Sequence, residues 1–278
     1  MKKLNNIIGF TLLLSFVNIS NAEKAPFESS YEPLPSTNTI FRNANIYDGD
    51  GNEFNETDLL IKDGKIIAIG KDLPGSSDFI EVDATNKWIT PGIIDIHSHM
   101  GVYSAPSVSS SSDGNEATSP VTADVWAEHS IWTQDPQFAL ALKGGVTTFH
   151  VLPGSANLIG GRGVTAKNVQ RNTINSMKFP NAPHTLKMAC GENPKRVYGN
   201  RKQAPSTRMG NIAGYRKAWI DAESYLSRLD EYDSKSDEAK EIGYKPKRDL
   251  ELETLAGVLR GEILVHNHCY RADEMAMM

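Results

Sequence analysis

The run from Trp88 to Met100 constrains the chain most, because it joins an apolar strand to two closely spaced histidines. Side chains along a strand alternate with a period of two, so His97 and His99 point to the same side. Two imidazoles leaving one strand end together form half of a transition-metal site. A pair of hydrogen-bonded structural histidines is the alternative. The residues that predict a buried strand before the pair are Ile93, Ile94 and Ile96.

The first residues predict export. Lys2 and Lys3 precede an apolar run over residues 7–17, which is too short to span a bilayer, and a small-residue cleavage site ends at Ala22. Residues 1–22 are therefore predicted to be a signal peptide that is cleaved after Ala22, which places the protein in the periplasm or outside the cell. Residues 23–36 are rich in proline and predict an extended leader.

The charge excludes two classes of partner. The formal net charge is −5, and removal of Lys2 and Lys3 makes the mature chain more acidic. This balance argues against nucleic acid and against an anionic membrane surface, and no membrane span is predicted. Cys190 and Cys269 have no spacing that indicates a disulfide framework, so we expect packed free thiols.

Two kinds of organisation follow one another along the chain. Residues 37–90 read as short strands joined by turns, and the apolar runs on either side of Asp63-Gly64 predict a hairpin. From residue 91 onward strands and helices alternate, which predicts βα units around a parallel sheet. Strands are expected at residues 146–152, 185–190 and 262–268, and helices at 135–143, about 206–230 and 249–260.

Further candidates follow the later strands. His266 and His268 repeat the spacing of the first pair at another strand end, where barrel enzymes place their sites. Lys187 lies inside an apolar strand, and a buried ammonium is costly unless it is paired or loses its charge. The alternative is a lysine that reaches water or pairs with a carboxylate. Gly160 to Gly163 predicts a tight turn, from which Arg162 is a candidate for binding a substrate carboxylate. The remaining histidines, His129, His150 and His184, are interpreted as structural.

These motifs resemble the amidohydrolase superfamily, in the branch of imidazolonepropionase-like proteins and metal-dependent dipeptidases. The segments 151–157, 186–188 and 193–198 fit that branch as well. The resemblance implies an α/β fold: a (β/α)8 TIM barrel over residues 91–278, preceded by a small β-sandwich domain over residues 37–90. It also implies a divalent cofactor, with one or two ions and zinc as the expected metal.

The resemblance assigns roles to individual residues. It implies that His97, His99 and His266 bind metal and that Lys187, carboxylated at N6, bridges two ions. Glu192 is the alternative bridge, because some relatives use a glutamate after a strand. His268 and Arg162 are the expected substrate-binding residues.

The superfamily also expects a histidine after strand 6 and a catalytic aspartate after strand 8. The sequence ends soon after Tyr270, so it is expected to carry about five of the eight strands and to be the N-terminal portion of a longer protein. No catalytic residue is identifiable in it, because the expected aspartate lies beyond the chain end.

The predicted function is exported, metal-dependent hydrolysis of C–N amide-type bonds in a small molecule or short peptide, with metal-activated water. One alternative is a mononuclear deaminase or cyclic-amidase relative in which Lys187 is not carboxylated. The other is a non-catalytic truncated fragment. The sequence gives no indication of oligomeric state.

Overall fold

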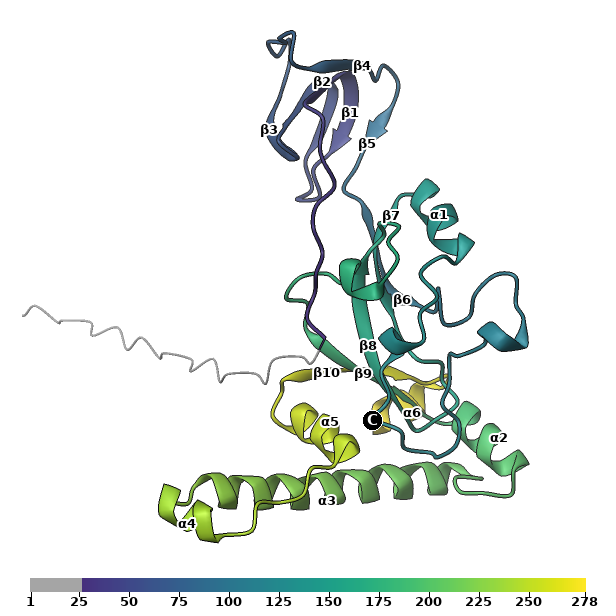
Figure 1. Cartoon of the computed structure of the whole chain (residues 1–278). Helices are drawn as coiled ribbons and strands as arrows, with labels where there is room; N and C mark the ends of the chain where they lie inside the picture. The colour runs from purple at the N-terminus through teal and green to yellow at the C-terminus, as the bar shows by residue number, and fades with distance from the viewer. Residues whose placement is uncertain (1–26) are drawn as a thin grey trace, which may run out of the picture.

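The computed structural model describes residues 27–278, which form two β-sheets with helices packed against the second (Figure 1). The predicted signal peptide, residues 1–22, and the first residues of the predicted leader lie outside the described residues. The mixed α/β class expected from the sequence is confirmed. Within the described residues no helix is both long enough and apolar enough to cross a membrane.

The first sheet has the strand order β3-β2-β1-β4, and β5 also pairs with β1. Its antiparallel part contains the predicted hairpin, in which Asp63 and Gly64 have φ angles of 50° and 72°. Glycine adopts this left-handed conformation without a steric penalty, so it suits the tight turn. The residues form one sheet, and the two-layered sandwich stays a prediction. The strands are β1 (Thr39–Tyr47), β2 (Glu53–Lys62), β3 (Lys65–Gly70), β4 (Ile80–Asp83) and β5 (Trp88–Ile89).

The described part of the leader, residues 27–36, has no helix or strand and runs from the part of the protein that contains the second sheet to the first sheet (Figure 1). Its start is anchored by contacts with residues far along the sequence. The ring of Phe27 meets that of His129 edge-on at 4.9 Å, and the Ser30 N–H donates to the Asn175 carbonyl at 2.9 Å. These contacts hold the start of the leader against η2 (Ala127–His129) and η3 (Ile174–Ser176).

The second sheet has the order β10-β9-β8-β7-β6. β6 is parallel to β7 and β9 is parallel to β10, whereas β8 is antiparallel to both of its neighbours. The strands predicted at residues 146–152, 185–190 and 262–268 are confirmed to within one residue at each end. The strands are β6 (Ile93–Ser98), β7 (Val146–Val151), β8 (Ile159–Lys167), β9 (His184–Ala189) and β10 (Ile263–His268).

Strand β8 corrects two predictions, the fully parallel sheet and the tight turn at residues 160–163. The glycines of that segment lie inside the strand because neighbouring groups approach its backbone closely. A Cβ on Gly161 would lie 2.5 Å from the Val125 carbonyl oxygen, and one on Gly163 would lie 2.6 Å from Thr185 Oγ1. Glycine in a strand often marks such an approach.

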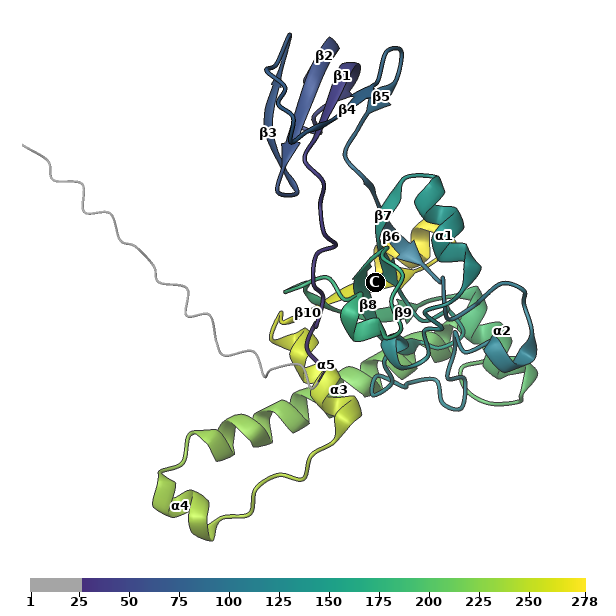
Figure 2. The same ribbon diagram turned by 45° about the horizontal axis from the view of Figure 1, so that its top comes forward.

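The helices cover the outer face of the second sheet. α5 contacts both β10 and α3, and the apolar core on this side includes Leu186, Tyr215 and Leu255. The far half of α3 and α4 extend away from the sheet (Figure 2). The helices are α1 (Pro136–Lys143), α2 (Glu192–Asn200), α3 (Arg208–Asp233), α4 (Asp237–Ile242), α5 (Leu250–Leu259) and α6 (Ala272–Met277), with short 3-10 turns η1 (Ser109–Ser111), η2 (Ala127–His129) and η3 (Ile174–Ser176).

The isoleucines of β6 are exposed, which corrects the prediction of a buried strand. Ile93, Ile94 and Ile96 have exposed fractions of 53 %, 61 % and 69 %. The physical reason is position, because β6 is an edge of the sheet and has a neighbour on one side. β10 is the other edge, and Leu264 and Val265 are exposed on it.

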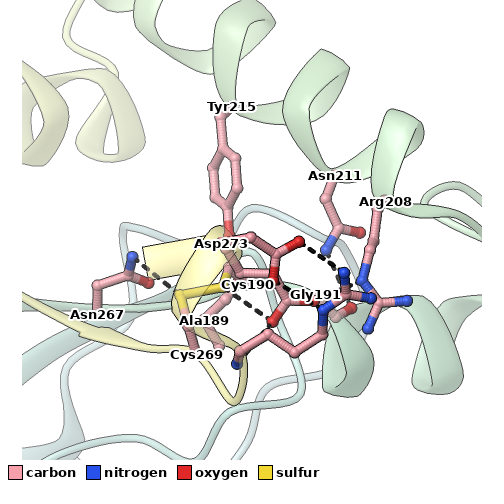
Figure 3. Close-up of a disulfide and its surroundings, with 11 residues drawn as sticks. Ala189, Cys190, Gly191, Arg208, Asn211, Tyr215, Asn267, Cys269 and Asp273 are labelled. Atoms are coloured by element: carbon pink, nitrogen blue, oxygen red, sulfur yellow. Dashed lines mark hydrogen bonds and ion pairs between the residues drawn. A yellow bond between two sulfur atoms is a disulfide. The ribbon is translucent and has the colours of Figure 1, made fainter. Parts of the chain in front are cut away.

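The two cysteines form a disulfide, so the prediction of free thiols is wrong (Figure 3). β9 and β10 pair in register, with Ala189 opposite His268, and Cys190 and Cys269 directly follow the last residues of the two strands. Their Cα atoms are 5.0 Å apart, within the range that a disulfide requires. The bond therefore ties the ends of β9 and β10 together.

A buried ion pair joins η2 to the segment after β8. Lys178 Nζ donates to the Glu128 carboxylate at 2.7 Å and to the Phe27 carbonyl at 2.5 Å. Both side chains of the pair are less than a tenth exposed. The lysine thus links the leader to the body of the protein.

We predict that reducing the disulfide lowers the free energy of unfolding by about 2–5 kcal/mol, because the bond closes a long loop in the unfolded chain. Urea denaturation with and without reductant measures the change. The chain has two cysteines, so reductant has a single target. Cys190→Ser/Cys269→Ser should be equally destabilised and insensitive to reductant. An unfolding midpoint that reductant does not move in the native protein contradicts the prediction.

We predict that Glu128→Gln lowers the free energy of unfolding by about 3–5 kcal/mol, because it leaves the Lys178 charge buried without its partner. Asp221→Asn is the matched control. It breaks an exposed pair with Lys217 and should change stability by less than about 1 kcal/mol. Both are measured by chemical denaturation, and similar losses in the two variants would refute the prediction.

Candidate active site

The strand register of the second sheet brings three predicted site residues to its inner face. His266 on β10 lies directly opposite Lys187 on β9, so both side chains share one face. His268 follows on the same side. His97 lies near the end of β6 and His99 just past it, at the other edge of the sheet.

The sheet curls, which brings together inner-face side chains from strands that are three places apart. Strands are spaced about 4.8 Å apart, so β6 and β9 would be about 14 Å apart in a flat sheet. Lys187 Nζ nevertheless lies 3.1 Å from His97 Nε2. The rings of His150 on β7 and His266 on β10, also three strands apart, have centroids 4.9 Å apart. The inner face therefore surrounds a cluster of imidazoles and one lysine.

Lys187 is buried without a counter-ion. Its side chain is 1 % exposed, and no carboxylate of the described residues lies within ion-pair distance of it. Desolvation lowers the pKa of Lys187 to about 8. The lysine therefore does not reach water. The alternative interpretation of the sequence required that it should reach water or pair with a carboxylate.

The surroundings of the four predicted site histidines favour their neutral form. Desolvation lowers the pKa of each, and repulsion from the Lys187 charge lowers it further. The ring of His99 is oriented by a 2.8 Å hydrogen bond between its Nδ1 and the Leu152 carbonyl. A neutral imidazole with one nitrogen fixed in this way has its other nitrogen available as a ligand. The residues are His97, His99, His266 and His268.

No group of three or more His, Cys, Asp or Glu side chains in the described part of the chain is arranged to hold a metal ion. The donors come as histidine pairs around a lysine, and an ammonium is not a metal ligand. A carboxylated lysine would add the missing oxygen donors at the centre of the cluster. The set of neutral imidazoles and a buried lysine without a counter-ion therefore fits a divalent metal site that includes a carbamate.

The structure does not bring Arg162 to this cluster. Arg162 is paired with Leu186, whose side chain belongs to the outer core, and its guanidinium lies 3.9 Å from the centroid of the Trp126 ring. The cavity that it lines is formed with α5, on the helix side of the sheet. The prediction that Arg162 binds substrate assumed that it lies in a loop. It lies on β8, where the alternation of side chains along the strand directs it to the helix side of the sheet.

Glu192 is also in a different setting from the one predicted. It is the first residue of α2 rather than part of a loop, and its side chain is exposed. The cavity that it lines contains Lys195, Arg196 and Arg208 and none of the histidines. Between the two predicted bridging residues, the structure places Lys187 among the imidazoles.

Sequence reasoning missed His150 as a site residue. Its strand was predicted, but the histidine has no partner at metal spacing along the chain. The contacts with His266 and with two threonines arise from neighbouring or opposing strands, so strand pairing was needed to find it.

The chain resembles known amidohydrolases in both sequence and structure. No family model matches the sequence. An amidohydrolase structure from Thermotoga maritima MSB8 superposes with a TM-score of 0.76 and 37 % identity, over 86 % of this chain and 60 % of that one. The amidohydrolase tasK of Hapsidospora irregularis is 34 % identical over 265 residues, which are 89 % of this chain and 26 % of the relative. The chain belongs to the amidohydrolase superfamily.

This amidohydrolase chain also matches shorter parts of other members. A dihydroorotase of Ligilactobacillus salivarius is 43 % identical over 63 residues, which are 22 % of this chain. The chain spans about a quarter of the length of tasK and three-fifths of the Thermotoga chain. The superfamily resemblance drawn from the histidine and lysine motifs is thus confirmed.

Proposed function

We propose that the protein is a metal-dependent hydrolase of C–N amide-type bonds in a small molecule or short peptide. The observation that carries the proposal is the convergence of His97 and His99 from the end of β6, and of His266 from β10, on the buried Lys187 of β9. Its relatives are amidohydrolases, which supports the reaction class. The curl supports a further proposal, that the second sheet is part of a (β/α)8 barrel.

The residues would divide the metal site between them. His97 and His99 would hold one divalent ion, expected to be zinc, and His266 would hold a second. Lys187 would bridge the two as N6-carboxylysine: the neutral amine attacks the carbon of CO2, a C–N bond forms, and the proton leaves to solvent. When bound, the metal supplies Lewis acidity for the substrate carbonyl and lowers the pKa of a water molecule.

Other groups would orient the metal ligands or contact the substrate. The Leu152 carbonyl fixes the plane of His99. His268 stands beside Tyr270, with ring centroids 4.6 Å apart, where it can contact the substrate.

We also propose that the protein is exported and that its signal peptide is removed after Ala22. A disulfide between Cys190 and Cys269 supports this, because such bonds persist in oxidising compartments. N-terminal sequencing of the exported protein should give Glu23 as the first residue. Mature protein that begins at Met1 would refute the cleavage.

We predict that replacing His97 and His99 together by Ala removes bound metal almost completely, because both imidazoles of the first ion are lost. Metal content per chain is measured by mass spectrometry. A native protein with about two ions per chain supports the bridged site, and one with about one ion supports a mononuclear deaminase-like or cyclic-amidase-like site. Metal content unchanged in the double variant would refute the metal centre.

We predict that Lys187→Ala lowers bound metal and activity roughly tenfold or more, and that short carboxylic acids restore part of both by supplying the missing oxygens. Glu192→Ala is the control, because Glu192 is exposed at the start of α2. The opposite pattern, a mild Lys187→Ala and a crippling Glu192→Ala, would assign the bridge to Glu192.

A further inference from the structure

His150 is buried within the inner face of the second sheet, next to the proposed site. The residue is 6 % exposed and lies on β7. A Cβ added to Gly163 on β8 would lie 2.8 Å from His150 Nε2. The glycine thus leaves the space that the imidazole fills.

Two hydroxyls fix the orientation of this ring. His150 Nδ1 is 2.9 Å from Thr165 Oγ1 on β8, and His150 Nε2 is 2.9 Å from Thr185 Oγ1 on β9. Both ring nitrogens are therefore hydrogen-bonded to residues of rigid strands. A ring held at both nitrogens cannot rotate without breaking at least one bond in a buried, low-dielectric setting, which is costly.

The fixed ring stacks on His266. Their centroids are 4.9 Å apart and their planes are inclined by 24°, which is an offset stacked arrangement. Within the described residues His266 makes no side-chain hydrogen bond, whereas His99 is oriented by the Leu152 carbonyl. Metal-binding histidines normally have their ring orientation fixed by a hydrogen bond from the second nitrogen. Among the contacts of the described residues, stacking on His150 is the one that can set the plane of the His266 ring.

We propose that His150 is a positioning residue for His266: locked by Thr165 and Thr185, it holds the His266 ring in the orientation that binds metal. This inference rests on the proposed function, because it takes His266 to be a ligand. A positioning role and a space-filling role for His150 predict different metal affinities. Loss of the ring should weaken metal binding even where the protein stays folded.

The test uses cobalt as the probe. Apo-protein is titrated with Co²⁺, affinity is measured by competition with a chelator, the visible absorption bands report the ligand field, and urea denaturation reports stability. His150→Ala should weaken Co²⁺ binding by about 10- to 100-fold, the range found when a supporting partner of a ligand is removed. His150→Phe keeps a flat ring for the stack but lacks both nitrogens that the threonines hold, so it should restore only part of the affinity.

Two further variants keep the test decisive if His150→Ala does not fold. Thr185→Val removes one of the two hydroxyls and should weaken Co²⁺ binding several-fold with altered absorption bands. His184→Ala is the matched control, because His184 lines a cavity on the helix side of the sheet; it should leave the affinity unchanged.

His266→Ala separates the two proposals. If it weakens Co²⁺ binding while folded His150 and Thr185 variants bind like the native protein, the positioning role is overturned and the metal site stands. If His266→Ala itself leaves Co²⁺ binding unchanged, His266 is not a ligand and the proposed function fails with it. Loss of stability in the His150 variants without loss of affinity assigns His150 a structural role and overturns the inference.

Discussion

The in-register pairing of β9 with β10 is the constraint on which the rest of the structure depends. It sets His266 beside Lys187 on the inner face and Cys190 beside Cys269 at the strand ends. A shift of one residue would move every side chain of a strand to the opposite face. The disulfide locks the two strands at the end nearest the site, so the same pairing that places the functional side chains is also covalently held.

Burial of Lys187 has a cost that the surrounding structure must offset. An ammonium without a counter-ion is unfavourable in a desolvated setting, and the lowered pKa of Lys187 reflects this. β9 tolerates it because its other face packs in the core with Leu186 and Met188. The proposed conversion to a carbamate would change the sign of the charge and make the same burial favourable beside cations.

Curling of the sheet determines which residues form the site. His97 and His99 are recognisable from their spacing alone, and so is the pair on β10. Their convergence on Lys187 requires that strands three places apart face one another. The same curl adds His150, which no motif singles out, and strand alternation on β8 excludes Arg162 by turning it toward the helices.

The sequence by itself determined the local elements and the ligand pairs, because hydrophobic periodicity, turn residues and His-x-His spacing are short-range signals. The hairpin at Asp63-Gly64 and the strands ending in histidines were predictable for this reason. The tertiary structure decided the direction of β8, the exposure of the β6 isoleucines, the disulfide, and the separate settings of Lys187 and Glu192. Each of these depends on which strands are neighbours and how far the sheet curls, and those are contacts between residues tens of positions apart that no local pattern encodes.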